Sequence, residues 1–383
     1  MKSLLILGRQ PELGLAELES LYGAENMTVI GRGGALLNID HEDVAFSRLG
    51  GSIKLAKVLT ILEKTDWPSI EKYLVHTIPK HLEQQPEGKL RLGISTYGLS
   101  VSPDHLHTTS LKLKKVIKEM GKSVRFIPNK SAALNSAQVI HNKLTGLNGW
   151  ELVLARFDDK TVLAQTIIEQ DIEAYASRDQ NRPMRDARVG MLPPKLAQIL
   201  INLANPDNDA TLLDPFCGTG VVLQEALLMG YRAYGSDLEP RMVEYSDKNL
   251  DWMFKIKLWN TEQGDATKHS WKHFDSVACE TFLGKPLSSL PERYILDQIR
   301  QECDEIHEKF LKNIATQAKS GTRLCLAVPA WNTKYGFLHL KTLDLLDKLG
   351  YTRKSFVFAS NEELIYHRPD QIVARELVIL ERK

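Results

Sequence analysis

The sequence predicts an α/β chain in which two small α+β domains precede a mostly parallel sheet covered by helices. Three observations support this prediction. The chain has 383 residues, which exceeds one domain of typical length. From Leu196 onward, short apolar runs alternate with amphipathic ones, as in a parallel sheet with crossover helices. Over roughly the first 60 residues the patterns follow the order strand, helix, strand, strand, helix, strand, which suits a ferredoxin-like fold.

The first block, residues 1–65, is expected to form this ferredoxin-like domain. Pro11-Glu12 opens a helical pattern with leucines on one side. Gly31-Arg32-Gly33-Gly34 separates two strand patterns and is a hairpin signal. Glu42–Leu49 is helix-like and stops at Gly50-Gly51. The expected strands are Ser3–Leu7, Met27–Ile30, Ala35–Ile39 and Ile53–Leu62.

Residues 66–172 are expected to form a second α+β domain. Its helical patterns are Ile70–Leu82, Thr108–Met120 and Ala132–Leu144. Its strand patterns are Leu90–Thr96, Val124–Ile127, Glu151–Phe157 and Thr161–Ile168. A linker over residues 173–190, with the polar stretch Ser177–Asp186, then leads to the predicted C-terminal domain, residues 191–383.

Composition and charge narrow the class of protein. Hydrophobic residues make up 43% of the chain and charged residues 25%, which is ordinary for a globular protein. The four Cys lie far apart without a Cys-x-x-Cys pair, so we expect neither a disulfide scaffold nor a metal site. No apolar run approaches the length of a bilayer span, and Leu4–Leu7 is too short for a signal segment. We therefore expect a soluble cytoplasmic protein.

Positive charge is concentrated in the second block. Residues 71–150 contain 12 Lys or Arg and 5 Asp or Glu, although the net charge of the whole chain is only +1. A solvated helix face would explain one such cluster, but a surplus confined to one domain of a neutral chain favours an RNA or DNA footprint. The expected contacts are Lys112, Lys114, Lys115, Lys118, Lys122, Arg125 and Lys130. In the linker, Arg182 and Arg185 either contact phosphate, cap the neighbouring cleft or are simply solvated.

The strongest local signal is Asp214-Pro-Phe-Cys-Gly-Thr-Gly220, which joins the strand Thr211–Asp214 to the helix Val221–Met229. Its glycines let the backbone approach a ligand closely. No Lys-Ser/Thr follows the glycines, so this is not a Walker loop, and Leu223 replaces the third glycine of a dinucleotide loop. A turn that starts on Asp and lacks phosphate-binding groups suits an adenosyl ligand with a cationic amino-acid tail, which is S-adenosylmethionine.

Acidic residues also follow the next two strands. The strand Tyr231–Gly235 leads to Asp237, which can accept hydrogen bonds from ribose hydroxyls, and Asp265 follows the third strand, where it can accept from the adenine amine. A single Asp at a strand end is a helix N-cap as often as a ligand, but three in succession favour a cofactor site. The expected contacts are Asp214, Pro215, Phe216, Gly218, Gly220, Asp237, Leu238, Asp265 and Ala266. The late strand Arg323–Val328 and a hairpin of Lys354–Ala359 with Ile372–Leu380 complete a sheet that resembles the class I, Rossmann-like methyltransferase fold.

These motifs together resemble the THUMP-domain tRNA guanosine-N2 methyltransferases of the guanosine-10 group. The resemblance rests on Asp214–Gly220, Arg182-Pro-Met-Arg185, Gly190–Leu196, Leu364–Gln371, Leu7-Gly8-Arg9, Glu17-Leu18 and Arg48–Gly51, and it is patchy over 60–170. It implies a class I domain that uses S-adenosylmethionine, a THUMP-like second domain that grips tRNA, and transfer of a methyl group to an exocyclic guanine amine. Some relatives work with a small activating subunit.

One motif departs from the family pattern. The fourth strand, Phe274–Cys279, runs into Glu280-Thr281-Phe282-Leu283, where the family carries Asp/Asn-Pro-Pro-Tyr. Glu280 can replace the acceptor side chain, the Thr281 carbonyl can still accept from the amine, and Phe282 can stack on the base. Methyl transfer to a weakly nucleophilic amine needs positioning and acceptors for the developing positive charge, and Glu280 meets this need.

Three alternatives stay open at this point. The altered loop is also compatible with a tRNA-binding protein whose cofactor site is vestigial or regulatory. The Asp214–Gly220 string would also fit an amine methyltransferase that acts on rRNA or DNA. A covalent mechanism would need a Cys nucleophile, but Cys217 lies inside the glycine loop, and Cys279 and Cys325 lie in or beside apolar strands, where Cys is usually a core residue.

Overall fold

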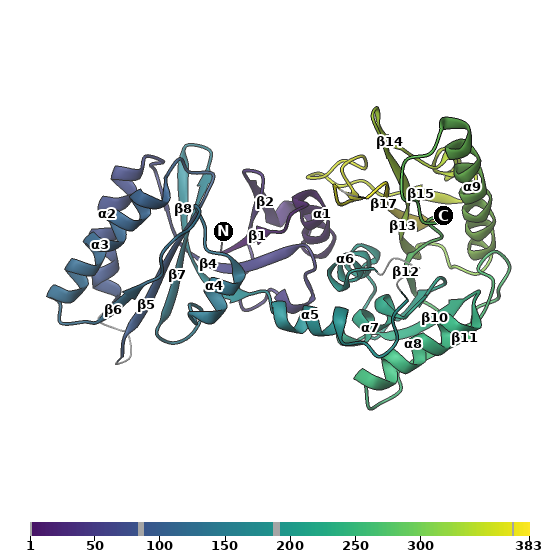
Figure 1. The fold of residues 1–383 in the computed structure, drawn as a ribbon, viewed down its shortest axis with the longest axis horizontal. Coiled ribbons are helices and arrows are strands. Elements are labelled where there is room, and N and C mark those ends of the chain that lie inside the picture. The colour runs from purple at the N-terminus through teal and green to yellow at the C-terminus, as the bar shows by residue number, and fades with distance from the viewer. Residues whose placement is uncertain (1, 83–87, 187–191, 370) are drawn as a thin grey trace. The chain divides into compact units, whose positions relative to one another are not determined.

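The computed structural model describes residues 2–82, 88–186, 192–369 and 371–383 (Figure 1). The chain divides into two compact units, each made of three segments. Unit 1 comprises Met1–Pro11, Gly23–Ser47 and Ser52–Ile172, and unit 2 comprises Glu12–Tyr22, Arg48–Gly51 and Glu173–Lys383. The predicted boundary near residue 65 thus falls inside unit 1, and the separate domains 1–65 and 66–172 stay a prediction.

Unit 1 is built on one sheet, which has the order β2-β3-β1-β4-β8-β7-β5-β6 over the described residues (Figure 1). Neighbouring strands are antiparallel, except that β5 is parallel to both β6 and β7. The strands are β1 (Ser3–Leu7), β2 (Met27–Ile30), β3 (Gly34–Leu37), β4 (Ser52–Leu62), β5 (Leu90–Tyr97), β6 (Val124–Phe126), β7 (Gly149–Phe157) and β8 (Lys160–Glu169). The strands of both predicted N-terminal domains therefore meet at the β4–β8 pair.

The helices α2 (Trp67–His81) and α3 (Pro103–Glu119) pack on one face of this sheet (Figure 1). Asp66 and Ser102 cap them by accepting the N–H groups of Ser69 and His105. Their apolar faces share a buried cluster with β5, β7 and β8, which removes a large apolar area from water. The structure thus confirms the predicted helices over 70–82 and 108–120, and both helices begin earlier than expected.

A buried ionic cluster joins β4 to β7 and β8. The Lys54 ammonium lies 2.5 Å from a Glu151 oxygen and 3.6 Å from a Glu169 oxygen, and none of the three side chains is more than 3% exposed. Lys54 also donates to the Leu134 carbonyl at 3.0 Å. Ser95 and Thr166 donate to Glu151. Burial raises the pKa of Glu169 to about 7.

Two predicted helices of unit 1 are wrong or too long. Residues 42–49 contain only the short 3-10 helix η2 (Phe46–Arg48), because Arg48–Gly51 leave unit 1 and join unit 2. The predicted helix Ala132–Leu144 is reduced to α4 (Ser136–His141). Its start is delayed because the Ala132 carbonyl and the Leu134 N–H bond to Thr96 and Ser95 of β5.

Unit 2 contains the predicted mostly parallel sheet, which has the order β11-β10-β9-β12-β13-β17-β15 over the described residues. The pairs from β11 to β13 are parallel, whereas β17 is antiparallel to β13 and β15. The strands are β9 (Thr211–Asp214), β10 (Arg232–Asp237), β11 (Trp259–Gln263), β12 (Ser276–Glu280), β13 (Arg323–Thr333), β14 (Gly336–Leu338), β15 (Tyr351–Arg353), β16 (Ile365–Tyr366) and β17 (Val373–Arg382).

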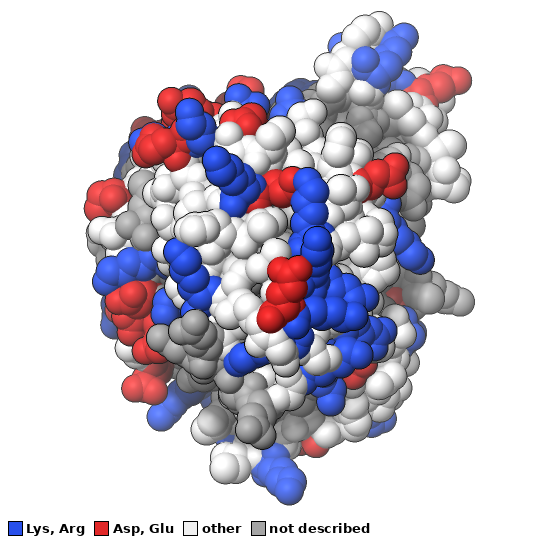
Figure 2. Space-filling model, turned by 90° about the vertical axis from the view of Figure 1, so that its left-hand side faces the viewer, with Lys and Arg blue, Asp and Glu red and all other residues white. Residues whose placement is uncertain are grey.

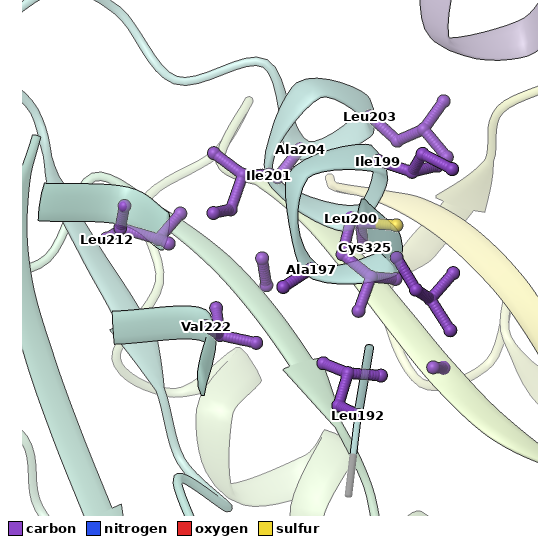
Figure 3. Packing of buried hydrophobic residues seen from close by; sticks show 14 of the residues in the cluster. Leu192, Ala197, Ile199, Leu200, Ile201, Leu203, Ala204, Leu212, Val222 and Cys325 are labelled. Atoms are coloured by element: carbon purple, nitrogen blue, oxygen red, sulfur yellow. The ribbon is translucent and has the colours of Figure 1, made fainter. Parts of the chain in front are cut away.

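Helices cover both faces of this sheet. One buried cluster joins the helices α6 (Pro194–Ala204), α7 (Val221–Leu228) and α8 (Pro240–Met253) to the strands. Figure 3 shows Ile201 of α6 on the side of Leu212 and Leu200 beside Cys325. A second cluster joins α9 (Arg293–Ala315) to the opposite face. A crossover between parallel strands requires such covering helices.

The helix α1 (Pro11–Tyr22) belongs almost entirely to unit 2 although β1 and β2 on either side belong to unit 1. The Glu17 carboxylate is fully buried and accepts hydrogen bonds from Asn202 Nδ2 at 2.7 Å and from the N–H groups of Gly50 and Gly51 at 2.9 and 2.8 Å. Arg48 donates to Asn202 Oδ1 at 3.0 Å. The two N-terminal motifs of the resemblance therefore meet in one hydrogen-bond network.

Two further expectations for unit 2 need correction. Lys354–Ala359 is not a strand; besides β13, the strands that pair with β17 are β15 and β16. Glu19 of α1 accepts the N–H groups of Val357 and Phe358. The polar stretch 177–186 is not simply a solvated linker, because α5 (Ile172–Gln180) covers its start and the Arg182 side chain is buried. Residues 187–191, which belong to the linker and the Gly190–Leu196 motif, and Asp370 of the closing motif lie outside the described residues.

Across the described ranges, the helices are too short or too polar to cross a bilayer.

Candidate active site

The acidic residues singled out in the sequence lie at one edge of the unit 2 sheet. Asp214, Asp237 and Glu280 are the last residues of β9, β10 and β12, and Asp265 follows β11 by two residues. These four strands are parallel, so their carboxyl ends meet at the same edge. Open α/β sheets bind ligands in the crevice at this edge.

The glycine loop between β9 and α7 is held by backbone and carboxylate bonds. Asp214 Oδ1 accepts the Phe216 N–H at 3.0 Å, and Asp237 Oδ2 accepts the Gly218 N–H at 2.9 Å. The second Asp237 oxygen accepts the Glu239 N–H at 3.0 Å. Asp237 therefore ties the loop to the end of the neighbouring strand and to the start of α8.

Gly220 allows the loop to turn against α8. Its φ of 83° lies in the left-handed region, and a Cβ there would lie 2.8 Å from Ser246 Oγ and 3.2 Å from Ser246 Cα.

We expect Gly220→Ala to lower the melting temperature of unit 2 more than Gly230→Ala does. Gly230 has a similar φ of 90° but open space around its Cβ, so it carries only the backbone cost of about 1–2 kcal/mol. Equal losses of melting temperature would contradict the steric argument.

A cavity of about 910 Å³ opens in front of these strand ends. Its wall includes all the predicted cofactor contacts except Gly220, namely Asp214, Pro215, Phe216, Gly218, Asp237, Leu238, Asp265 and Ala266. The predicted base-site residues Glu280, Thr281 and Phe282 also line it. The structure therefore brings both predicted sets of residues to a single cavity, while their roles stay predictions.

The cavity wall is largely apolar, and five of its charged residues are acidic, namely Asp214, Asp237, Glu239, Asp265 and Glu280. Burial raises the pKa of Asp214 well above its usual range, and the neighbouring Asp237 and Glu280 carboxylates raise it further. Burial likewise raises the pKa of Asp237. These shifts mean that ionising Asp214 and Asp237 is costly. A cationic ligand would offset this cost, and the same carboxylates would stabilise it.

Glu280 forms an ion pair that the sequence analysis did not foresee. The Arg375 Nε donates to Glu280 Oε1, and the two side chains are only 7% and 16% exposed. Glu280 is in register with Ala327 of β13, and Arg375 is in register with Pro329, so a single strand separates them. Burial raises the pKa of Glu280, and Arg375 opposes this shift. The expected acceptor is therefore present but carries a cationic partner.

Thr281 is held by a buried histidine of α9. The Thr281 hydroxyl lies 2.6 Å from His307 Nε2, and His307 Nδ1 lies 2.6 Å from the Cys303 carbonyl. Burial lowers the pKa of His307 to about 4, so the ring is neutral near pH 7. Because Nδ1 faces a carbonyl, it carries the proton, and Nε2 accepts from the hydroxyl. The Thr281 side chain thus anchors the loop.

Phe282 and Leu283 are both half-buried and both line the cavity. Phe282 packs against the cluster that α9 forms with the sheet. Gly284 follows with a φ of 85°, and its neighbours are Cys303 and Ile299 of α9. An apolar wall therefore stands beside Glu280, as a stacking surface for a base would require.

The cysteines do not offer a nucleophile. All four are buried. Burial raises the pKa of the Cys217 and Cys279 thiols well above the usual range, and nearby Asp214 adds to the shift of each. Since the thiolate is the reactive form, these groups stay protonated near neutral pH.

The residues expected to contact RNA fall into two groups. Those of the second block lie on α3, on β6 and in the adjacent loops, and Figure 2, which views the molecule from the side of α2 and α3, shows Lys and Arg side chains gathered there. Lys114 and Arg125 line a cavity of about 330 Å³ together with Lys89 and His107. Arg182, by contrast, is 3% exposed and lies 3.4 Å from the Thr219 hydroxyl of the glycine loop, so its side chain is not on a surface that RNA can reach. Arg185 lies outside the helices and contacts the Gln180 carbonyl.

Two residues of the site were missed in the sequence, and each left a signal. Arg375 and Glu376 interrupt the apolar run of β17, which is unusual for a buried strand. His307 occurs on the apolar face of α9 among Cys303, Phe310 and Ile314. Charged or titratable residues in apolar runs mark positions whose partners come from elsewhere in the chain.

Comparisons with known proteins agree with this geometry. Residues 182–338 match the UPF0020 family model, described as an RMKL-like methyltransferase domain. The tRNA (guanine(10)-N2)-dimethyltransferases of Methanothermobacter thermautotrophicus and Pyrococcus abyssi are each 30% identical, over 37% and 42% of this chain and 39% and 43% of their own length. The chain therefore matches less than half the length of these curated relatives.

The fold is shared over a longer span. The solved structure of TrmN from Thermus thermophilus superposes with a TM-score of 0.55 and covers 100% of both chains at 16% sequence identity. This likeness confirms the predicted α/β fold with a Rossmann-like methyltransferase domain. The family match lies within this fold, so residues 182–338 are similar to an RMKL-like methyltransferase domain.

Proposed function

We propose that the chain transfers a methyl group from S-adenosylmethionine to the exocyclic N2 amine of a guanine in tRNA. The observation that carries this proposal is the cavity at the carboxyl ends of β9 to β12, whose wall includes both the cofactor-loop residues and Glu280. The names of the relatives supply the substrate class. With tRNA as the substrate, the proposal implies a cytoplasmic protein, and a small activating subunit stays a prediction from the resemblance.

The residues present fit the cofactor. Asp214 is 2% exposed, and among the described residues its carboxylate has one donor, the Phe216 N–H, which bonds to Oδ1. Its second oxygen is available to a cationic ligand. Asp237 and Asp265 would accept from the ribose and adenine groups, and the Gly218 backbone leaves space beside them. When bound, S-adenosylmethionine supplies an electrophilic methyl group.

The chain's own residues would prepare the amine. The half-buried Phe282 would hold the base plane, and Glu280 would accept an N–H of the amine as positive charge develops. The Thr281 carbonyl is a second acceptor, because His307 holds this residue through its hydroxyl. Glu280 need not act as a strong base, since the proton can leave after transfer.

Nucleoside mass spectrometry tests the proposal. Unmodified tRNA would be incubated with the full chain and S-adenosylmethionine that carries a labelled methyl group, then digested to nucleosides. We expect label in N2-methylguanosine or its dimethyl form. Label in methyladenosine, or preferential labelling of rRNA or duplex DNA, would favour another amine methyltransferase. An absence of label from every nucleic acid would favour a tRNA-binding protein with a vestigial cofactor site.

The RNA footprint gives a further prediction. Neutralising Lys112, Lys114 and Lys115 to Ala is expected to weaken tRNA binding and to lower the slope of log affinity against log salt by up to about one per lost phosphate contact. Lys112 and Lys115 allow a controlled comparison, because both are exposed residues of α3. They differ in that the Lys112 ammonium forms an ion pair with Glu71 at 2.5 Å. The single change Lys115→Ala should therefore weaken binding more than Lys112→Ala does. An unchanged slope in the triple variant would count against the footprint.

A further inference from the structure

The Glu280–Arg375 pair has hydrogen-bonding capacity that the protein itself does not use. Among the described residues, the Arg375 guanidinium makes one hydrogen bond, from Nε to Glu280 Oε1. Its two terminal nitrogens carry four more N–H donors. Glu280 Oε2 likewise accepts no hydrogen bond from the described part of the chain. Both residues line the large cavity, and both are mostly buried.

Unused donors and acceptors at a buried position point to a ligand. The Arg375 side chain is only 7% exposed and lines the cavity, so a ligand in the cavity could accept from its remaining donors. The cavity wall near this pair is formed by side chains from three strands. These are Asp214 of β9, Glu280 of β12 and Arg375 of β17. A ligand that accepts from Arg375 and donates to Glu280 would satisfy the pair without breaking it.

The order of these groups matches one nucleobase edge. Guanine presents an acceptor, O6, followed by two donors, N1–H and N2–H. A carboxylate with two acceptor oxygens beside a fork of donors is the complement of this order. Adenine presents a donor followed by an acceptor, so its ring nitrogen would face a carboxylate oxygen. Cytosine presents one donor followed by two acceptors and meets the same repulsion.

We propose that Arg375 is a specificity-determining residue that reads guanine O6, while Glu280 accepts from N1–H and from the N2 amine. This inference rests on the proposed function and adds to it the residue that discriminates guanine from adenine. The strand β17 thereby contributes to the site, in addition to closing the sheet. Arg375 also holds Glu280 in place and is a positioning residue in that respect.

A binding experiment separates this inference from the proposed function. The full chain loaded with S-adenosylhomocysteine would be titrated with guanosine, inosine and adenosine monophosphates by ligand-observed NMR. We expect guanosine monophosphate to bind about tenfold or more tightly than adenosine monophosphate. Inosine monophosphate keeps O6 and N1–H but lacks the N2 amine, so it should fall between them.

Variants identify the residues responsible. Arg375→Met, which removes every donor, should abolish the preference for guanosine over adenosine monophosphate, and Arg375→Lys should keep part of it through its ammonium group. The double variant Glu280→Arg with Arg375→Glu keeps an ion pair but reverses the order of donors and acceptors. It should recover the melting temperature lost in the single variants without recovering the guanine preference. Binding of S-adenosylhomocysteine, which does not involve Arg375 in our assignment, reports whether each variant is folded.

The outcomes are distinguishable. No preference for guanosine monophosphate in the wild type, or a preference that survives in Arg375→Met or returns in the reversed pair, would overturn the inference even if the chain methylates RNA. A guanine preference that depends on Arg375 supports the inference. If the same wild-type protein then methylates no RNA, the proposed methyl transfer fails while the base-reading site stands.

Discussion

Lys54→Met is expected to lower the free energy of opening of unit 1 by about 3–5 kcal/mol. The change would leave the Glu151 and Glu169 carboxylates buried without their cation, which is among the most costly single changes in a protein interior. Hydrogen exchange followed by mass spectrometry would measure the opening at β4 and β7. Peptides from α6 in unit 2 would serve as a reference within the same molecule.

The matched control is Lys160→Met on the neighbouring strand β8. Lys160 pairs with Glu63 at 2.9 Å, but the two side chains are 39% and 71% exposed, so its loss should cost less than about 1 kcal/mol. Equal effects of the two substitutions would contradict the assignment of Lys54 as the central cation of unit 1.

The Lys54 cluster also predicts a pH dependence. Burial raises the pKa of Glu169 to about 7, above about 4.3 in an unfolded chain. The folded state therefore binds this proton more tightly. Its contribution to stability is complete at acid pH and is lost as the pH rises from about 4.5 to about 7. Without Lys54 the buried Glu169 depends more on protonation, so the destabilisation of Lys54→Met should be larger near about pH 8 than near about pH 5.

Asp237→Ala is expected to weaken S-adenosylmethionine binding by about 100-fold. The proposed bonds from two ribose hydroxyls to a charged acceptor would be lost, and each such bond contributes about 1.5–3 kcal/mol. Isothermal titration calorimetry would measure the dissociation constant. Asp237→Asn keeps one acceptor oxygen and should give an intermediate affinity.

Asp275→Ala is the control for the Asp237 change. Asp275 also accepts a backbone N–H of the same sheet, from Thr211 at 2.8 Å, but it precedes β12 and does not line the cavity. Its removal should leave the dissociation constant within about twofold, since no ligand contact is lost. If Asp237→Ala binds as the wild type does, the cofactor assignment is wrong.

The position of the acidic residues at the carboxyl ends of the strands could be predicted from the sequence, because it depends on the local sequence pattern. An apolar run followed by an acidic residue and a glycine turn has few alternative structures, so Asp214 and Asp237 were placed at the carboxyl edge and Asp265 just beyond it. The cavity confirms that these residues lie together.

Features that the sequence did not predict, or predicted wrongly, occur where distant segments decide the structure. Lys54 interrupts an apolar pattern as a surface residue would, and only the register of β4 with β8 places it opposite Glu169. Arg375 lies 95 residues from Glu280 along the chain, and the strand between them is paired on both sides. Lys354–Ala359 has the composition of a strand, yet the Val357 and Phe358 N–H groups in it donate to Glu19 of α1. Local propensity is overridden in such cases by tertiary contacts.

The segments Glu12–Tyr22 and Arg48–Gly51 make unit 2 discontinuous in the chain, and this has a consequence for protein synthesis. The helix α1 emerges from the ribosome long before Asn202 and Phe358, which it contacts through Glu17 and Glu19. Folding of one domain after the other during translation is therefore insufficient for unit 2. A fragment that starts at Glu173 would lack α1, so dissection of this protein at residue 172 would yield an incomplete methyltransferase unit.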